Sequence, residues 1–414
     1  MAVPTNILQQ VQTYQMSNLA YLQNLACFVS TANTKFKDFD RLTANLGDTV
    51  TFDLPPRFTT TNSLVASFQP ADQRVLSLTV NQQVSTSYAF TDQQFIFNVR
   101  DYMDKFGKAA VAELASQIEA GIALNCVINT YRFYGDGVTP INSYNQLAKA
   151  LALFRNYGSA NGRAKGYIAD VAVPDIVGSG LNQFALDRNE EAASSWELGM
   201  FSNCDWYQSN LLPVHYAGTN GDNGRTLTVT ATTVDANGAV IGITFDNGSG
   251  LSETNAFRAN DKLQFQDAVS GITNLRYLTF IGHKVSNSPV QVRVTADADS
   301  IAGVSTVLID PPLQVAPTAF QNINTSIISG MKAKALPSHR AGMITSGDPL
   351  FLGMPQLPTL TPFPTGNMVD PDTGVSIRQY YGSIFGQNTR GMVHDCIYGS
   401  KLASEYAIAL IFPL

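Results

Sequence analysis

Hydrophobic and polar residues alternate along three short stretches early in the chain. These stretches are Thr49–Leu54, Arg74–Val80 and Val84–Phe90, and most of their polar positions hold uncharged residues such as Thr, Ser and Gln. A period of two is typical of β-strands, so residues 46–97 are predicted to form an extended β ribbon. An isolated ribbon is marginal in water, and this one has little apolar surface of its own. We therefore expect it to lie on a second copy of the chain, which favours an assembly protein.

Two helices are predicted to flank this ribbon, one over Thr5–Val29 and a longer one over Val99–Asn129. The apolar stripe of the longer helix comprises Met103, Phe106, Ala110, Leu114, Ile118 and Ile122. Its opposite face carries Asp101, Lys105, Lys108, Ser116 and Glu119. Gly107 and Gly121 on the packed side indicate either close approach of another backbone or tolerated weak points.

The middle of the chain changes from a mixed pattern to a β pattern. A second amphipathic helix is predicted over Ser143–Tyr157, and a buried strand over Gly166–Val173 that ends at Pro174. Six short strands follow, separated by turn signals such as Asn-Gly: Thr226–Val234, Ala239–Phe245, Lys262–Val269, Leu275–Val285, Val290–Ala296 and Thr306–Ile309. Such regular spacing predicts a small antiparallel barrel or sandwich, inserted as a self-contained unit over residues 218–317.

The last part of the chain is rich in Pro and Gly and closes with two predicted strands. These strands are Ser376–Phe385 and Met392–Leu414. The run Ala407–Phe412 is apolar throughout, so we expect it to be buried.

Charge is sparse along the 414 residues. Charged residues make up 14% of the chain, against about 25% in an ordinary soluble domain. Because charges are depleted from interface cores, this favours a surface largely covered by partners, with a low-charge monomer as the alternative. The net charge is −6 and no basic stripe is visible, which argues against tight nucleic-acid binding. A container that encloses DNA without gripping it remains compatible with this charge.

Cysteine usage and segment hydropathy give no sign of secretion or of a membrane span. Cys27, Cys126, Cys204 and Cys396 are scattered singly, so reduced buried thiols are expected rather than a zinc site or a disulfide scaffold. Residues 1–15 lack the basic and apolar regions of a secretory signal. No uncharged apolar run approaches the ~20 residues of a transmembrane helix.

The common catalytic motifs are absent from the sequence. There is no GxSxG, Walker A loop, HExxH or strand-associated GxGxxG. His394 and Cys396 would share one face of a strand, but residues two apart in a strand lie ~6.5 Å apart, too far for a direct thiol–imidazole hydrogen bond. His215, His283 and His339 are isolated in the sequence, so structural roles are expected for them.

Carboxylates offer two further candidate sites. Glu190-Glu191 is interpreted as a solvated helix start, and Asp370 with Asp372 as turn chemistry, with weak Ca²⁺ binding as the alternative. We therefore assign no catalytic, cofactor-binding or metal-binding residue, and no cofactor.

Several segments, in this order, resemble the major capsid (coat) proteins of tailed double-stranded DNA bacteriophages. The segments that carry the resemblance are Phe90–Asn98, Glu113–Glu119, Phe201–Gly218, Arg258–Phe265, Asn324–Ser326 and Gly347–Phe351. The chain looks closest to the short-tailed-phage branch with an inserted β domain. This family shares its fold with the herpesvirus capsid floor.

The resemblance implies an α+β fold of the tailed-phage capsid type. Its parts would be an N-terminal helical arm (1–45), an extended β loop (46–97), the spine helix of a peripheral domain (98–131), a first part of an axial domain (132–217), an inserted β-barrel domain (218–317) and a return through the axial domain and the peripheral-domain β-sheet (318–414). The extended loop would lie across a neighbouring subunit.

The resemblance also implies a non-enzymatic structural role. The chain would form hexamers and pentamers of an icosahedral shell around packaged double-stranded DNA, without sequence-specific DNA contacts. Further partners would be a separate scaffolding protein, a portal protein at one vertex and, optionally, a decoration protein, with no membrane. The location would be the virion capsid, assembled in the bacterial host cytoplasm.

Two departures from the family pattern carry further expectations. Some relatives link subunits covalently through a Lys of the extended loop, but no lysine occurs between Lys37 and Lys105. We therefore expect a shell held without covalent bonds. Only about 45 residues precede the ribbon, which leaves no room for a large fused scaffold. The competing interpretations are a β-rich tail, fibre or adhesin with a carbohydrate-binding β domain, and an enzyme such as a polysaccharide lyase.

Overall fold

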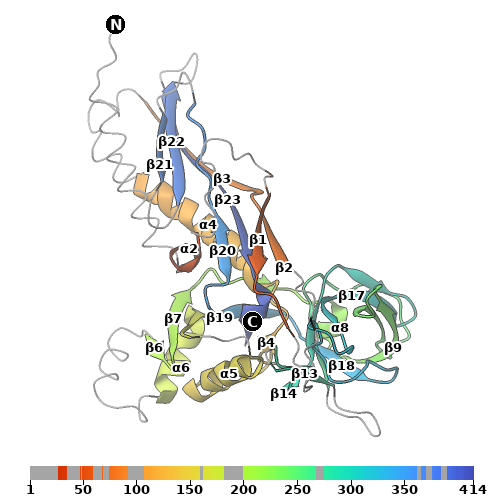
Figure 1. The fold of residues 1–414 in the computed structure, drawn as a ribbon. Coiled ribbons are helices and arrows are strands. Elements are labelled where there is room, and N and C mark those ends of the chain that lie inside the picture. The colour runs from red at the N-terminus through yellow and green to blue at the C-terminus, as the bar shows by residue number, and fades with distance from the viewer. Residues whose placement is uncertain are drawn as a thin grey trace. The chain divides into compact units, whose positions relative to one another are not determined.

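A computed structural model describes most of the chain as a β-rich α+β protein (Figure 1). The described residues are 27–34, 47, 49–58, 68, 74–91, 107–158, 162–180, 199–266, 275–280, 282–360, 365–369, 375–383 and 389–414. The chain divides into two compact units. One comprises residues 1–53, 75–125 and 350–402, and the other comprises 54–74, 126–349 and 403–414.

The first unit is built from two sheets and two helices. Its strands are β1 (Thr49–Leu54), β2 (Arg74–Thr79), β3 (Gln82–Thr91), β20 (Leu350–Gly353), β21 (Thr365–Val369), β22 (Ser376–Ser383) and β23 (Thr389–Leu402). Its helices are α2 (Cys27–Thr31) and α4 (Lys108–Val127). The remaining predicted parts of the N-terminal arm and of residues 92–106 lie outside the described residues.

The long strand β23 organises the larger sheet of this unit. It pairs antiparallel with β3 over ten positions, from Thr389↔Thr91 to Tyr398↔Gln82. It also pairs with β22, which continues to β21, and its last residues pair with β20. In Figure 1 α4 runs beside these long strands. Gly121 of α4 faces Tyr398, whose hydroxyl would lie 2.0 Å from a Cβ at that position. Close packing thus explains Gly121, although a side chain and not a backbone makes the approach.

The predicted ribbon forms strands where it is described. The expectation that the ribbon lies on a second copy of the chain is wrong for β3. β1 and β2 pair with each other in a two-stranded sheet. β3, in contrast, lies along β23 of its own chain, and Leu78 and Val80 are fully buried beside Ile397. A strand more than 300 residues later in the sequence therefore supplies a support that the local pattern could not indicate.

Helix α4 confirms the helix predicted over Val99–Asn129 for the described part of that range, with one correction. Leu114, Ile118 and Ile122 are fully buried, as expected from the apolar stripe. Glu119 was placed on the polar face, but it is 2% exposed. Its carboxylate accepts hydrogen bonds from the backbone N–H groups of Phe28 (3.0 Å) and Val29 (2.9 Å). A buried carboxylate is tolerated here because it satisfies the free N–H groups at the start of α2.

The second unit contains a seven-stranded mixed sheet, flanked by helices. In the order β4-β24-β19-β5-β7-β6, its strands are Phe133–Tyr134, Ala407–Pro413, His339–Ser346, Ala164–Ala169, Cys204–Ser209 and Met200–Phe201, and β8 (Val214–His215) pairs with β19. The helices are α5 (Tyr144–Asn156), α6 (Val173–Gly180) and the short α8 (Thr219–Asp222). As predicted, every residue of β24 from Ala407 to Phe412 is buried.

Two local predictions in this unit have different outcomes. Helix α5 begins at its N-cap Ser143 and ends before Gly158, which has a positive φ, and its predicted apolar face is buried. The strand predicted to end at Pro174 ends earlier, at Ala169. A 3₁₀ turn (Asp170–Ala172) follows, and Pro174 lies in the first turn of α6, where a missing N–H costs nothing.

A closed six-stranded barrel follows, drawn at the right of Figure 1. Its strands, in order around the barrel, are β10 (Val240–Asp246), β17 (Val304–Leu313), β15 (Gln291–Val294), β12 (Lys262–Phe265), β18 (Lys332–Ala335) and β9 (Thr226–Val234). Two small ribbons flank it: β11 (Glu253–Phe257) with β16 (Ala298–Ser300), and β13 (Arg276–Leu278) with β14 (Val285–Pro289). β18 lies beyond residue 317, so the predicted insert ends before the strand that closes the barrel. A single apolar core runs from α5 through the sheet into the barrel.

The described helices include none that is both long enough and apolar enough to cross a membrane.

Candidate functional site

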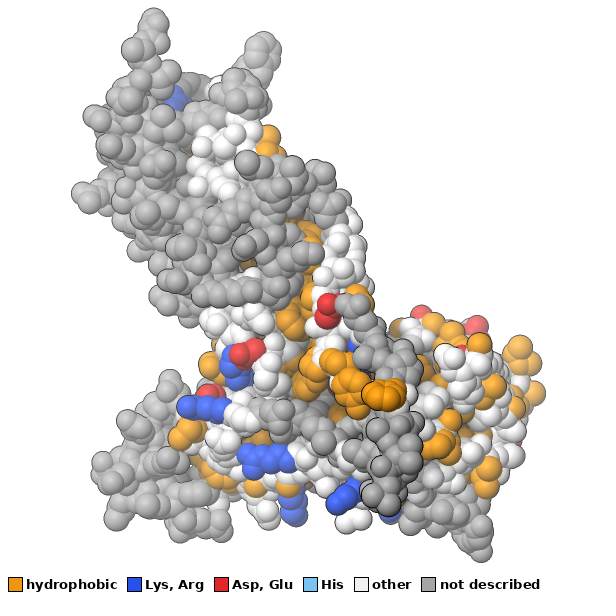
Figure 2. Space-filling model, in the orientation of Figure 1, with side chains coloured by type: hydrophobic (Ala, Val, Ile, Leu, Met, Phe, Trp, Pro, Cys, Tyr) orange, Lys and Arg blue, Asp and Glu red, His pale blue; other side chains and the backbone are white. Residues whose placement is uncertain are grey.

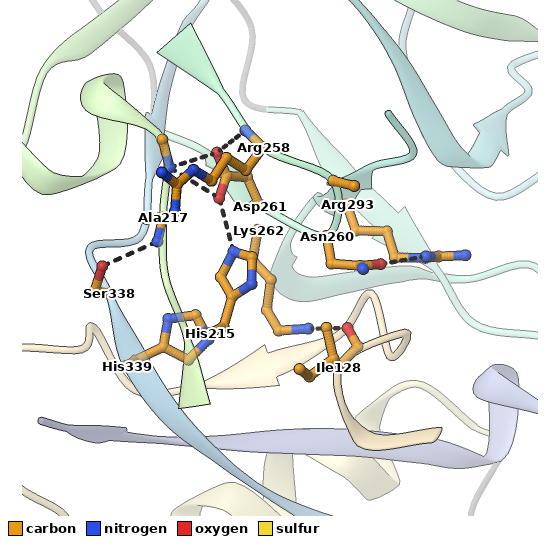
Figure 3. Close-up of polar contacts among 12 residues, drawn as sticks. Ile128, His215, Ala217, Arg258, Asn260, Asp261, Lys262, Arg293, Ser338 and His339 are labelled. Carbon is orange, nitrogen blue, oxygen red and sulfur yellow. Dashed lines mark hydrogen bonds and ion pairs between the residues drawn. The ribbon is translucent and has the colours of Figure 1, made fainter. Parts of the chain in front are cut away.

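A group of buried polar side chains lies where the barrel meets the sheet of the second unit (Figure 3). At its centre, Asp261 is fully buried and precedes strand β12. Its Oδ1 lies 2.7 Å from His215 Nε2, and its Oδ2 accepts hydrogen bonds from the N–H groups of Gly218 (3.1 Å) and Arg258 (2.9 Å). The carboxylate thus ties β8 and the following turn to the barrel.

Two histidines that are isolated in the sequence meet in this group. β8 and β19 pair with His215 opposite His339, and the two rings lie 5.4 Å apart. Burial, together with the charge of Lys262, lowers the pKa of His339 to about 3, so its ring is neutral near pH 7. Strand pairing thus brings together two residues that are 124 positions apart in the sequence.

Lys262 is the second buried charge of the group and is 1% exposed. Its Nζ donates hydrogen bonds to the carbonyl oxygens of Ile128 (2.9 Å) and Thr130, in the turn that follows α4. Burial, reinforced by the nearby Arg293, lowers the pKa of Lys262 to about 7. Arg293 binds the same turn, because its Nη1 donates to Asn129 Oδ1 (2.9 Å). The barrel therefore holds this turn through two cations.

This group has the residue types of a catalytic site, but its geometry is that of a structural joint. Asp261 and Lys262 are at most 1% exposed, so a substrate reaches neither unless the joint opens. The hydrogen bonds of Lys262 go to main-chain carbonyls, and those of Asp261 go to main-chain N–H groups and one imidazole. A general base must lie within hydrogen-bond distance of the proton that it removes from the substrate. The burial of Asp261 and Lys262 keeps a substrate out of that distance. Sequence reasoning missed this joint because its members come from distant segments.

The His394-Asp395-Cys396 segment lies within β23 and also lacks the features of a catalytic pair. Burial lowers the pKa of His394 to about 4 and, with a smaller contribution from Asp395, raises the pKa of Cys396 to about 12. Neither a thiolate nor an imidazolium is therefore favoured near pH 7. Asp395 forms a buried two-point ion pair with Arg378 of β22. This ion pair connects β22 to β23.

Glu405 forms ion pairs with two arginines in the unit that contains the barrel. It pairs with Arg57 (2.8 Å) and with Arg74, which stand at the two ends of the segment between β1 and β2. Burial alone would raise the pKa of Glu405, but the two guanidinium groups outweigh it and hold that pKa below its usual value. Arg57 also stacks on Phe280 at 4.0 Å. One carboxylate thus fixes both ends of this long connection.

The remaining candidate residues form no site among the residues that the structure describes. Glu190, Glu191, Asp370 and Asp372 lie outside the described residues, and His283 lies in the turn between β13 and β14. Within the described ranges, no group of three or more His, Cys, Asp and Glu side chains is placed to hold a metal ion.

An open hollow lies between α5 and β14, in a part of the second unit where basic side chains are visible (Figure 2). Its two cations, Lys149 and Arg155, are exposed, and Arg155 donates to the Ser202 carbonyl (3.1 Å). A hollow whose charged lining is entirely exposed lacks the fixed donors of a specific ligand site.

Comparisons with known proteins find similarity in structure but not in sequence. No family model and no curated protein matches the chain. The solved structures to which it is similar include a chain from Mycobacterium phage Che8 (9% identity, 93% of this chain and 90% of that chain, TM-score 0.46). They also include the capsid of the cyanophage P-SCSP1u (11% identity, 89% and 84%, TM-score 0.37) and the mature capsid of bacteriophage PhiM1 (8% identity, 88% and 81%, TM-score 0.38). At these identities and TM-scores, the similarity assigns no function and no residue role to this chain.

Proposed function

We propose that the chain is the major capsid protein of a tailed double-stranded DNA bacteriophage, which assembles with copies of itself into a closed shell. The proposal extends the sequence resemblance to hexamers and pentamers, held without covalent links, that enclose packaged DNA. A separate scaffolding protein would direct assembly in the host cytoplasm. The parts 46–97, 98–131 and 218–317 would serve as extended loop, spine helix and inserted domain, with the barrel of the insert closed by β18.

The observation that supports this proposal most is the absence of charge over the successive strands β2 and β3 after Arg74. Residues 75–91 contain no charged residue and no proline. Along β3 every second side chain is exposed, including Gln83, Ser85 and Ser87. Natural proteins protect long edge strands with charges, prolines or bulges, because such strands pair readily with other chains. The exposed face and edge of β3 lack charged and proline residues, as expected of a surface that a second copy covers.

The neighbouring ribbon β1–β2 also exposes uncharged polar side chains, together with one carboxylate, Asp53. Thr49, Thr51, Ser77 and Thr79 are exposed, and the hydroxyls of Thr49 and Thr79 lie 3.0 Å apart. We assign the exposed polar faces of β1, β2 and β3 to contacts between subunits.

Charge insertion on β3 tests the proposal. Ser85→Lys and Ser87→Lys should each lower the yield of shells by about tenfold or more, since a charge buried unpaired at an interface is strongly unfavourable. Thr254→Lys is the matched control, because Thr254 is an exposed, uncharged residue of strand β11. The yield is measured by sedimentation and negative-stain microscopy, and urea unfolding checks that each variant folds. Equal shell yields from all three variants would contradict the assigned role of β3.

A further inference from the structure

Asn-Gly pairs occupy several turns in and next to the barrel. The pairs within the described residues are Asn220-Gly221, Asn223-Gly224, Asn237-Gly238 and Asn247-Gly248. Because glycine has no side chain, its backbone nitrogen is less shielded than that of any other residue. This nitrogen can attack Cγ of the preceding asparagine, with loss of ammonia, to close a succinimide ring. Water then opens the ring to aspartate or isoaspartate, so a neutral amide is replaced by a carboxylate.

Two of these asparagines are buried and bind each other. Asn220 in α8 is fully buried, and Asn247, which follows β10, is 7% exposed. Asn247 Nδ2 donates a hydrogen bond to Asn220 Oδ1 (2.9 Å), and Arg225 donates to the same oxygen (3.3 Å). Asn247 Oδ1 accepts from the backbone N–H (2.9 Å) and the hydroxyl (2.7 Å) of Ser249. A reaction at either Cγ must first break these bonds and admit water.

The other two asparagines are exposed. Asn223 is the C-cap residue of α8, and Asn237 lies in the turn between β9 and β10. The hydrogen bonds that these two residues form with the described part of the chain use their backbone atoms. A Cβ placed on Gly224 or Gly238 would meet nothing within 4 Å. Each of these turns therefore has room for the glycine nitrogen to rotate towards the amide.

The glycine N–H groups do not distinguish the four pairs. Each donates one hydrogen bond to a residue two or three positions earlier, at 2.8 to 3.1 Å. That bond must break at every pair before the nitrogen can attack. At Gly221 the backbone is also enclosed, since a Cβ there would lie 2.2 Å from the carbonyl oxygen of Leu336. The main difference between the pairs is therefore the burial and bonding of the asparagine side chain.

We propose that Asn223 and Asn237 are sites of spontaneous deamidation, and that the fold protects Asn220 and Asn247 from the same reaction. An exposed turn reacts after a small local fluctuation, whereas the buried pair reacts only after local unfolding, which is rarer. Each deamidation adds one negative charge to a chain whose net charge is already −6. The inference concerns the single folded chain and does not depend on the proposed function.

Peptide mapping of the unassembled full-length chain tests the proposal. The folded protein is kept in a mildly alkaline buffer made with heavy-oxygen water, so that every succinimide opened by water carries the label. Digestion follows at acidic pH, where deamidation is slow, and fragmentation spectra assign the label to single residues. Asn223 and Asn237 should gain label about tenfold or more faster than Asn220 and Asn247. Unfolded in guanidinium chloride, the same chain should label all four residues at similar rates.

Matched variants check the assignment of the label. Asn223→Gln and Asn237→Gln should each lose the label at the substituted position and keep it at the other, because glutamine must close a larger ring. Equal labelling of the four asparagines in the folded chain, or faster labelling of Asn220 or Asn247, would overturn the proposal. So would a difference that persists unchanged in guanidinium chloride, since the flanking sequence and not the fold would then set the rates.

Discussion

At the scale of single residues, buried charged side chains connect segments that are far apart in the sequence. Glu119 connects α4 to α2, Lys262 connects the barrel to the turn after α4, and Glu405 binds two arginines. Each of these charges loses hydration on burial, and hydrogen bonds or opposite charges offset that loss. These groups should therefore make folding stability depend on pH.

Lys262 gives the clearest pH dependence. Its pKa is about 7 in the folded chain, below the ordinary value of 10.5. Between these values the unfolded chain binds the extra proton, so raising the pH favours folding, by up to about 1.4 kcal/mol per pH unit. The urea midpoint of the unassembled wild type should therefore rise from pH 7 to pH 9 relative to that of Lys262→Met.

Lys332→Met is the control for this effect, because it removes a half-buried positive charge from the adjacent barrel strand β18. The difference between its midpoint and that of the wild type should stay constant over the same pH range. A constant difference for Lys262→Met as well would show that Lys262 is not the buried, destabilised cation described above.

At the scale of secondary-structure elements, close backbone packing joins β23 to β2. A Cβ at Gly399 would lie 2.3 Å from the carbonyl oxygen of Thr79, whereas a Cβ at Gly391 in the same strand would meet nothing within 4 Å. Gly399→Ala should thus destabilise the chain by about 1–3 kcal/mol, as overpacking does. Gly391→Ala should change stability by less than about 1 kcal/mol. Urea unfolding of both variants measures this, and equal effects would contradict the described close packing of β23 against Thr79 of β2.

Local sequence patterns predicted the elements that carry their own signals. The cap Ser143 and the apolar spacing of α5 specify that helix, and the strands β1, β2, β3 and β9 follow alternating or turn-bounded patterns. The pairing partners of these elements could not be predicted in the same way. β3 pairs with β23 and the barrel closes with β18, and both partners lie far along the chain. Glu119 was misplaced for the same reason, since the N–H groups that it binds lie 90 and 91 residues earlier.

The buried polar group around Asp261 and Lys262 could not be predicted from the sequence either. His215 and His339 are single histidines in unremarkable segments, and only the pairing of β8 with β19 brings them together. Lys262 directly follows Asp261 and begins the strand that is predicted over Lys262–Val269. An adjacent Asp-Lys pair at the start of an apolar strand was the one available signal, because charges are rarely placed there without buried partners.

At the scale of the whole molecule, sparse charge has a structural explanation. Many of the described ionic groups form ion pairs within the chain, and β3 and the β1–β2 ribbon expose mostly hydroxyl, amide and aliphatic groups. Surfaces of this kind contribute little electrostatic repulsion between copies. This distribution of charge is therefore the one expected of a chain whose copies bind one another at several surfaces.

The central claim is that copies of this chain assemble into a closed shell. Sedimentation velocity combined with negative-stain microscopy of the purified wild-type protein, alone and with the proposed scaffolding protein, tests that claim most directly. Closed particles or their hexameric and pentameric building blocks are the predicted result. Single chains that stay monodisperse at high concentration under both conditions would contradict it, as would fibres or trimers.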